Sequence, residues 1–155
     1  MEYSEIRNED REIFHDLLTW YFREGEDRDT PQEEIDFFID LLFGKLTAGE
    51  ISGCFANEEG TAVGFALWAM DTEEFDFSEM PGLGTILEIG LLPAYRGAGR
   101  GRKLAGFAEE SLKREGAGEC YVTAYGPAQS FWERCGYKAN GRIGRNGLPI
   151  LVKSI

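Results

Sequence analysis

The chain has 155 residues, 43% of them hydrophobic, and carries a net charge of −12 with only 16 lysines and arginines. This length suits one folded domain, and so acidic a chain lacks the basic face that a nucleic-acid-binding protein needs. No apolar run approaches the roughly 20 residues of a membrane span, and the first five residues are acidic where a signal peptide would be basic. We expect a single cytoplasmic domain over residues 1–155 that binds no nucleic acid and no membrane.

The charge is divided unevenly along the chain. Residues 1–80 hold 22 acidic and 5 basic side chains, whereas residues 81–155 hold 6 acidic and 11 basic ones. Two interpretations of the acidic half stay open. It is either a solvated surface or a field that attracts a cationic partner such as an amine.

The cysteines and the histidine indicate no metal site. Cys54, Cys120 and Cys135 are scattered and lack the spacing of metal ligands, so we expect reduced thiols and no bound metal. His15, the only histidine, lies within a helical pattern, where a lone histidine is usually structural.

The N-terminal part predicts a strand and two helices. The strand covers residues 3–7, and Asn8 is placed to cap a first helix that runs to about Arg23. A charged linker follows at residues 24–29. Thr30, with Pro31 and Glu33 after it, then has the spacing of a capping box at the start of a second helix.

Aromatic residues recur at helical spacing in this part of the chain. Such residues form either a packed core or an aromatic wall for a cation. They are Trp20, Tyr21, Phe22, Phe37 and Phe38.

The middle of the chain predicts a hairpin and a loop. Two β-rich runs at residues 51–56 and 61–70 flank a short turn at residues 57–60. Residues 71–84 are acidic and end in proline and glycines, which indicates a loop. The loop is either the wall or lid of a binding site or an inert connection.

The stretch from Ile86 to Gly101 joins an apolar strand to a glycine-rich turn, and a helical pattern follows to about residue 115. Gly97, Gly99 and Gly101 permit positive φ and leave no Cβ in the way, so successive N–H groups can converge on one anion. A helix N-terminus favours a phosphate at the same point. The stretch therefore predicts a site for a polyanion.

The spacing of the glycines excludes two familiar phosphate motifs. A Walker loop needs Gly-x-x-x-x-Gly-Lys-Ser/Thr, and a dinucleotide fingerprint needs Gly-x-Gly-x-x-Gly; neither occurs around residues 97–103. A turn that merely starts a helix remains the alternative.

The C-terminal part predicts a strand at residues 119–124, a brief helix at residues 128–135 and a hairpin at residues 137–143 and 148–153. The expected order is strand, helix, helix, three strands, helix, strand, helix and two strands. We therefore expect an α/β domain with a mixed sheet flanked by helices and one parallel crossover.

One motif carries a resemblance to a known family. Arg96, Gly99 and Gly101 form the pattern Arg-x-x-Gly-x-Gly, after an apolar strand and Pro93-Ala-Tyr95. This pattern resembles the pyrophosphate-binding motif of the GNAT superfamily of N-acetyltransferases.

A second motif extends the resemblance to nearly the whole chain. Ala128, Phe131, Gly136 and Tyr137 match the second GNAT motif in kind and spacing. Two motifs at the family's separation imply a GNAT-like fold.

The resemblance implies acetyl-coenzyme A as the cosubstrate. Its pyrophosphate would lie in the glycine-rich turn, and its pantetheine arm would pair with the edge of the preceding strand, where the N–H of Leu91 or Leu92 would stabilise the oxyanion. The implied cosubstrate residues are Leu91, Leu92, Arg96, Gly97, Ala98, Gly99, Arg100, Gly101, Arg102, Phe131 and Trp132.

Two positions depart from the family pattern. Tyr125 stands where asparagine is common, and Trp132 stands where the family has the tyrosine credited with protonating the leaving thiolate. An indole N–H donates a hydrogen bond but does not release its proton. We predict Tyr125 as the replacement acid, with Tyr121 as a second candidate, and a reaction without a general acid remains an alternative.

Glu88 is the predicted general base, because it is the one carboxylate in the apolar strand that leads to the site. The alternative interpretation is a glutamate that faces solvent or pairs with an arginine. Asp71 and the carboxylates of residues 73–79 are further candidates.

The sequence thus predicts an enzyme that moves an acetyl group from acetyl-coenzyme A to a primary amine of a small cationic acceptor, such as a polyamine or an aminoglycoside-like molecule. One alternative is a non-catalytic acyl-coenzyme A binding module or sensor. Another is a protein or peptide N-acetyltransferase. A homodimer remains an option.

Overall fold

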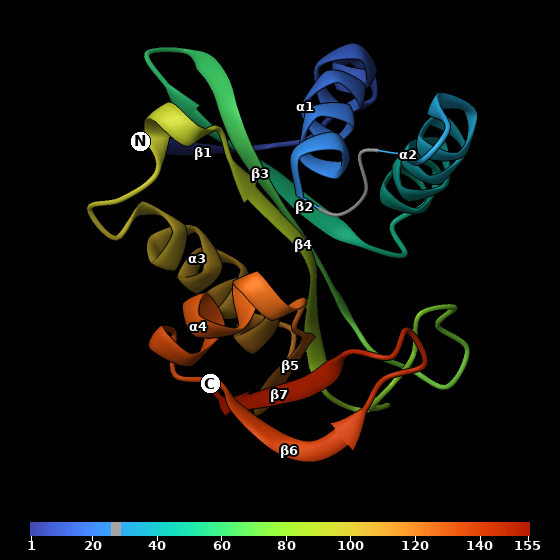
Figure 1. The fold of residues 1–155 in the computed structure, drawn as a ribbon, viewed down its shortest axis with the longest axis vertical. Coiled ribbons are helices and arrows are strands. Elements are labelled where there is room, and N and C mark those ends of the chain that lie inside the picture. The colour runs from blue at the N-terminus through green and yellow to red at the C-terminus, as the bar shows by residue number, and fades with distance from the viewer. Residues whose placement is uncertain (26–28) are drawn as a thin grey trace.

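The computed structural model describes residues 1–25 and 29–155, and its elements follow the expected order (Figure 1). The predicted mixed α/β class is confirmed. The strands are β1 (Glu2–Glu5), β2 (Ser52–Glu58), β3 (Thr61–Met70), β4 (Gly84–Leu91), β5 (Glu119–Thr123), β6 (Lys138–Ile143) and β7 (Pro149–Ser154). The helices are α1 (Arg11–Gly25), α2 (Gln32–Thr47), α3 (Arg100–Arg114) and α4 (Gly126–Arg134), with 3₁₀ turns η1 (Asn8–Asp10) and η2 (Pro93–Tyr95).

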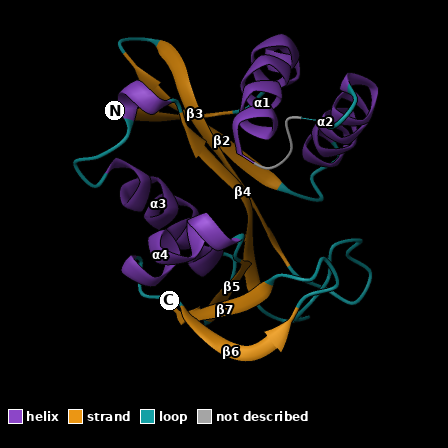
Figure 2. Cartoon of the chain, in the orientation of Figure 1, coloured by secondary structure: helices purple, strands orange, loops and turns teal. Residues whose placement is uncertain are grey.

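All seven strands form one sheet in the order β1-β2-β3-β4-β5-β7-β6. Neighbouring strands are antiparallel except β4 and β5, which form the parallel pair expected of the crossover through α3. Among the described residues, this pairing is limited to Gly84 with Cys120 and Thr85 with Tyr121. Beyond Thr85 the pairing with β5 ends, and β4 continues beside β3 as far as Leu91, toward the upper part of Figure 2.

Helices cover both faces of the sheet (Figure 1). On the α1 face, α1 and α2 bury an apolar cluster that includes Phe14 and Ile39. On the α3 face, α3 and α4 bury a second cluster that includes Leu104 and Trp132. The sheet therefore separates two cores. Within the described ranges, no helix is long and apolar enough to cross a membrane.

The second helix starts differently from the prediction. Pro31, with φ −56° and ψ 142°, is the N-cap of α2, and its carbonyl accepts the first helical N–H groups; the cap has no side-chain hydrogen bond. Thr30 therefore lies one residue too early to cap the helix, so the predicted capping box is wrong. Of the predicted linker at residues 24–29, residues 26–28 lie outside the described residues, and Glu24 and Gly25 belong to α1.

The loop between β3 and β4 is tied to two elements that are distant in the sequence. The ammonium of Lys45, a buried residue of α2, contacts the carboxylates of Asp76 and Glu50. On the other side, the Arg145 guanidinium donates to the Glu79 carboxylate at 3.3 Å and to the Ser78 carbonyl at 2.6 Å. The loop thereby links α2 to the β6–β7 hairpin.

Helices α1 and α2 are joined by a polar contact as well as by their apolar faces. His15 Nε2 lies 2.7 Å from a carboxylate oxygen of Asp36. This hydrogen bond raises the pKa of His15 above its usual 6.5, although burial acts in the opposite direction. The predicted structural role of His15 agrees with this contact.

The His15 contact predicts a pH-dependent stability. Because the folded-state pKa is raised, the stabilisation by charged His15 is complete below about pH 6.5 and is lost as the pH rises through the folded pKa. We expect His15→Gln to lower the free energy of unfolding more at pH 5.5 than at pH 9. Urea unfolding of both proteins at the two pH values measures this difference, and equal losses at both would contradict it.

Candidate functional site

The divergence of β4 from β5 leaves the edge of β4 open beside the glycine-rich turn. Leu92 N–H donates to the Val63 carbonyl of β3 at 2.8 Å. In an antiparallel ladder, alternate residues point their backbone groups to opposite sides, so the Leu91 N–H and C=O point away from β3 toward this open edge. Of the two predicted oxyanion donors, Leu91 has the suitable orientation, whereas the N–H of Leu92 is already bonded.

A β-bulge changes the faces of β4. The pairing with β3 shifts by one residue between Leu67 and Trp68, which leaves Leu87 as the extra residue of β4. Ile86 packs in the α3-face core, Leu87 packs against the α1-face core, and Glu88 contacts a side chain of α1. Leu87 and Glu88 therefore both face α1, although strict alternation would send Glu88 to the α3 face.

Glu88 is half-buried, and its Oε2 accepts a hydrogen bond of 2.8 Å from the hydroxyl of Tyr21. The carboxylate stands on the α1 face, three residues before Leu91, where an acceptor from that face could reach it.

The glycine-rich turn forms a concave run of backbone amides. Gly97, Ala98 and Gly99 have φ values of 87°, 53° and 75°, and Gly99 is the N-cap of α3. The Arg100 N–H donates to the Gly97 carbonyl at 3.1 Å, so the segment is a turn that leads into a helix, and successive N–H groups of such a turn can form an anion-binding nest. The first-turn N–H groups of a helix have no intrahelical partner, so Gly101 and Arg102 add donors to the same place.

The reason for one glycine differs from the prediction. Gly101 is helical, and the third residue with positive φ is Ala98 instead. At Gly101 a Cβ would lie 3.0 Å from the ring of Phe131, so the absence of a side chain lets α4 approach the start of α3. Gly101 is needed for packing rather than for a left-handed backbone.

The side chain of Arg96 turns back toward the sheet. Its Nε donates to the Leu91 carbonyl at 3.0 Å, and its guanidinium carbon lies 5.8 Å from the ring centre of Trp20. Arg96 therefore links the nest, the open edge of β4 and α1. Arg100 is half-buried, and Arg102 and Lys103 are exposed, so these side chains place positive charge near the start of α3.

The two departures in the second motif lie in different surroundings. Trp132 is 6% exposed and packs edge-to-face on Phe131 and Tyr137, so it belongs to the core of the α3 face. Tyr125 is 37% exposed and forms the N-cap of α4, just after the end of β5. Only Tyr125 of this pair presents an ionisable hydroxyl at the surface.

Asp71 and Tyr121 are engaged with each other. Asp71 is 1% exposed, and its Oδ2 accepts from the Tyr121 hydroxyl at 2.7 Å and from the amides of Glu79 and Met80. Burial would raise the pKa of Asp71, but the hydrogen bonds from Ser78, Tyr121 and the two amides outweigh it and lower that pKa. Burial and the neighbouring Asp71 raise the pKa of Tyr121. Both residues organise the β3–β4 loop, which argues against them as base and acid.

The predicted aromatic residues of α1 and α2 mostly pack together. Phe22 contacts Phe38 edge-to-face, and Tyr21 contacts Phe65 of β3 in the same way. Phe37, by contrast, is 72% exposed. The helical spacing thus indicated core correctly for most of the group but did not indicate the contacts of Trp20 and Tyr21 with Arg96 and Glu88.

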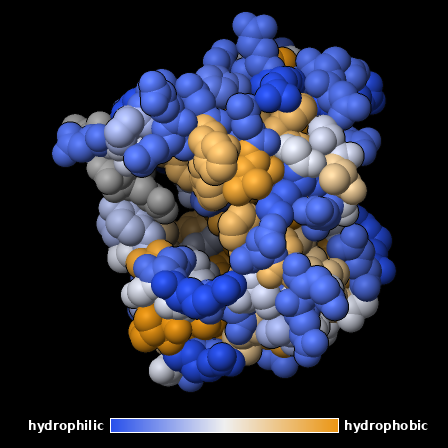
Figure 3. Space-filling model, turned by 90° about the vertical axis from the view of Figure 1, so that its right-hand side faces the viewer, coloured by the Kyte–Doolittle hydropathy of each residue, from blue (hydrophilic) through white to orange (hydrophobic). Residues whose placement is uncertain are grey.

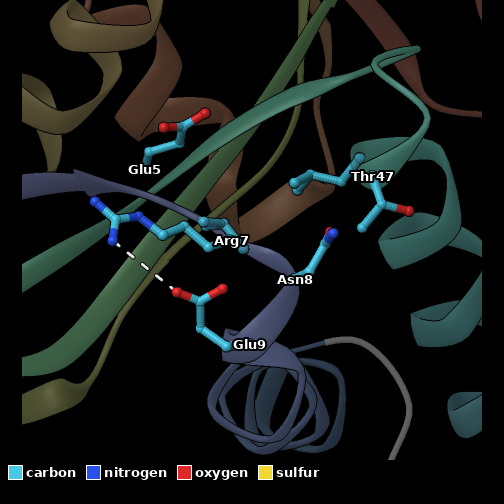
Figure 4. A pocket seen from close by; sticks show the side chains of 7 residues that line it. Glu5, Arg7, Asn8, Glu9 and Thr47 are labelled. Atoms are coloured by element: carbon cyan, nitrogen blue, oxygen red, sulfur yellow. Dashed lines mark ion pairs between the residues drawn. The ribbon is translucent and has the colours of Figure 1, made fainter.

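Two surface hollows lie at the other end of the sheet. One, of about 360 Å³, is lined mainly by polar residues where β1 leads into α1, and Arg7 and Glu9 point toward each other there (Figure 4). The other, of about 380 Å³, adjoins it along β1 and β2. Neither is lined by a predicted site residue. In residues 1–25 and 29–155, no group of three His, Cys, Asp or Glu side chains is arranged to hold a metal ion.

The arrangement of a nest, an open strand edge and a bulged strand agrees with the comparison to protein families. The family model described as acetyltransferase (GNAT) family matches residues 11–137. The chain belongs to this family. No curated protein matches the sequence of the chain.

Solved structures share the fold at low sequence identity. A GCN5-related N-acetyltransferase from Ralstonia eutropha is 22% identical with a TM-score of 0.76, over 93% of this chain and 96% of that one. The PaiA N-acetyltransferase from Thermoplasma acidophilum, in complex with coenzyme A, is 18% identical with a TM-score of 0.75, over 99% and 98%. AAC(6')-Iy, bound to the bisubstrate analogue CoA-S-monomethyl-acetylneamine, is 16% identical with a TM-score of 0.69, over 92% and 93%.

Gly101 and Gly106 offer a matched test of the contact between α3 and α4. Both are helical, but an added Cβ at Gly106 meets nothing within 4 Å. We expect Gly106→Ala to raise the free energy of unfolding by up to about 1 kcal/mol. Gly101→Ala should gain less, because the Phe131 ring must move. Chemical unfolding measures both, and equal gains would contradict the close contact.

Proposed function

We propose that this GNAT protein transfers an acetyl group from acetyl-coenzyme A to a primary amine of a small cationic acceptor, by direct attack in a ternary complex. The observation that carries the proposal is the open edge of β4. The anion nest lies beside this edge, and the carboxylate of Glu88 lies on the α1 face of the same strand. Acetyl-coenzyme A bound along that edge would expose its thioester to an amine that enters from the α1 face.

The cosubstrate would be bound mainly by backbone groups. The amides of residues 97–99, 101 and 102 would hold the pyrophosphate, with the side chains of Arg100 and Arg102 adding charge. The pantetheine arm would pair with the outward backbone groups of β4 as an added strand does. The Leu91 N–H would then face the thioester carbonyl and stabilise the oxyanion.

The chemistry needs a base and a way to stabilise the thiolate. A primary ammonium has a pKa near 10, so it must lose a proton before its nitrogen can attack. Glu88 would accept that proton, directly or through a water, and release it to solvent. The nitrogen attacks the thioester carbon, which forms the C–N bond and the tetrahedral oxyanion. When the oxyanion collapses, the C–S bond breaks, its electron pair leaves with the sulfur, and the nitrogen loses its second proton to solvent. Tyr125 would supply a proton to the thiolate, since the indole of Trp132 cannot.

Three observations support a small cationic acceptor. Exposed acidic side chains such as Glu24, Glu33 and Glu34 lie on α1 and α2, which cover the face from which the acceptor would enter. On the side of the molecule that carries α2 and the β3–β4 loop, the surface is hollowed below an apolar patch (Figure 3). The bound acetylneamine part of the AAC(6')-Iy analogue belongs to the same chemical class of acceptor.

We further infer a single domain that acts in a reducing compartment such as the cytoplasm, because one sheet includes all seven strands and all three cysteines are buried free thiols. The burial of Trp132 favours one alternative function, a non-catalytic acyl-coenzyme A sensor. That alternative predicts thermal stabilisation by acetyl-coenzyme A without thiol release across an amine panel.

Gly99→Glu tests the nest, with Gly49→Glu as its control. The two glycines have φ values of 75° and 77°, and an added Cβ meets nothing within 4 Å at either, so the backbone cost is similar. Only Gly99→Glu puts a carboxylate where the pyrophosphate would lie. We expect it to weaken acetyl-coenzyme A binding by at least about 100-fold, measured by calorimetry. Equal affinity in the two variants would refute the nest as the binding site.

Tyr125→Phe tests the proposed acid. If Tyr125 protonates the departing thiolate, its loss should lower kcat by about 100-fold, the typical contribution of a general acid, with the KM for acetyl-coenzyme A little changed. Steady-state thiol release measures both constants. An unchanged kcat across the pH range would show that the thiolate leaves without this tyrosine.

A further inference from the structure

We propose that Tyr21 is a positioning residue that orients Glu88 toward the ammonium group of the acceptor and so makes the enzyme select cationic over neutral amines. The inference rests on the proposed acetyl transfer. It names a residue of α1, outside both family motifs, as a determinant of acceptor specificity.

The first argument is the hydrogen bond between the two side chains. The Tyr21 hydroxyl donates to Glu88 Oε2 at 2.8 Å, joining residues 67 positions apart in the sequence. Both residues are half-buried. The bulge at Leu87 is what turns Glu88 onto this face, so the contact depends on the irregularity of β4 at the point where β5 has already diverged.

The second argument is that the ring of Tyr21 lies directly on the backbone of β4. A Cβ added at Gly90 would be 2.7 Å from Tyr21 Cδ1, so a larger residue at that position would displace the ring. Edge-to-face contacts with Phe65 and Phe22, both with ring centres 5.2 Å apart, hold the ring from two other sides. These contacts fix the orientation of the Tyr21 ring and therefore the position of its hydroxyl.

The third argument is the place of this contact beside the reacting edge. Trp20, the preceding residue of α1, lies under the Arg96 guanidinium that binds the Leu91 carbonyl. Consecutive residues of α1 thus reach the two flanks of Leu91, whose N–H is the proposed oxyanion donor. An acceptor held by Glu88 would lie next to the thioester.

The chemistry of the pair favours a cation. A carboxylate has about four lone-pair sites, and the hydrogen bond from Tyr21 uses one of them. A donor to a carboxylate favours its charged form over its protonated form. A charged and oriented carboxylate binds an ammonium through a charge-assisted hydrogen bond, which a neutral arylamine makes only weakly.

The experiment uses Tyr21→Phe, which removes the hydroxyl and keeps the ring on Gly90. Thiol release is measured with 1,5-diaminopentane, a cation, and 4-methylaniline, which is neutral at pH 7.5. We expect the KM for the diamine to rise about tenfold, in line with the loss of one charge-assisted hydrogen bond. The KM for acetyl-coenzyme A and the kcat and KM for 4-methylaniline should change less than twofold, and the Tm should change by less than about 2 °C.

Two further variants separate positioning from a general loss of structure. Tyr3→Phe removes the hydroxyl of a β1 tyrosine whose ring packs on Phe107, and it should leave the diamine KM unchanged. Glu88→Gln should raise that KM at least as much as Tyr21→Phe does. The double variant of Tyr21 and Glu88 should be no worse than Glu88→Gln alone, because the hydroxyl acts through the carboxylate.

An unchanged diamine KM in Tyr21→Phe, or additive losses in the double variant, would overturn the role of Tyr21 while leaving acetyl transfer intact. Equal losses for both acceptors would also overturn it, because they would show a structural defect. A wild-type protein that binds acetyl-coenzyme A but releases no thiol with any amine would overturn the proposed function, and this inference with it.

Discussion

The structure depends on one constraint, the early end of the parallel pairing between β4 and β5. A strand edge normally finds a partner, because unpaired backbone groups are costly to bury. Here the pairing stops at Thr85, and the bulge at Leu87 follows within two residues. The open edge, the outward Leu91 N–H and the turned Glu88 all result from that short segment. The nest at residues 97–99 lies at the far end of the same edge, so the site extends along one strand.

The short pairing leaves the two parts of the sheet with little direct connection. Side-chain contacts, in addition to the strand pairing, connect these two parts. Arg145 and Lys45 grip opposite sides of the β3–β4 loop, and a third cation, Lys153 of β7, binds the nearly buried Glu109 of α3 at 2.8 Å. Tyr137 donates to the same carboxylate at 2.9 Å. The contacts of Lys45 and Lys153 are partly buried and that of Tyr137 is buried, whereas those of Arg145 are exposed. Together they hold the divergent strands without closing the edge between them.

Much of this architecture was predictable from the sequence, because the order of elements follows hydrophobic periodicity and the nest follows from glycine spacing. The sequence could not show the bulge, since one extra residue in β4 leaves no mark in an apolar run, and the face of Glu88 follows from it. The sequence also did not show two tertiary contacts. The ring of Phe131 leaves little room for a side chain at Gly101, and the carbonyl of Leu91 accepts a hydrogen bond from Arg96. The sequence also could not distinguish Tyr21 from its aromatic neighbours, because only the structure shows the hydrogen bond of its hydroxyl to Glu88.

The open edge of β4 consists of peptide groups, which every residue carries regardless of its side chain. Substitutions at the sheet positions around Leu91 can therefore change the packing beneath the edge without removing the donors and acceptors that it presents. A binding surface of this kind constrains strand geometry more than amino-acid identity. Chains that share only 16–22% of their residues can then keep the fold over more than nine-tenths of their lengths, as the comparison structures do. Their side chains remain free to diverge on the two faces of the sheet.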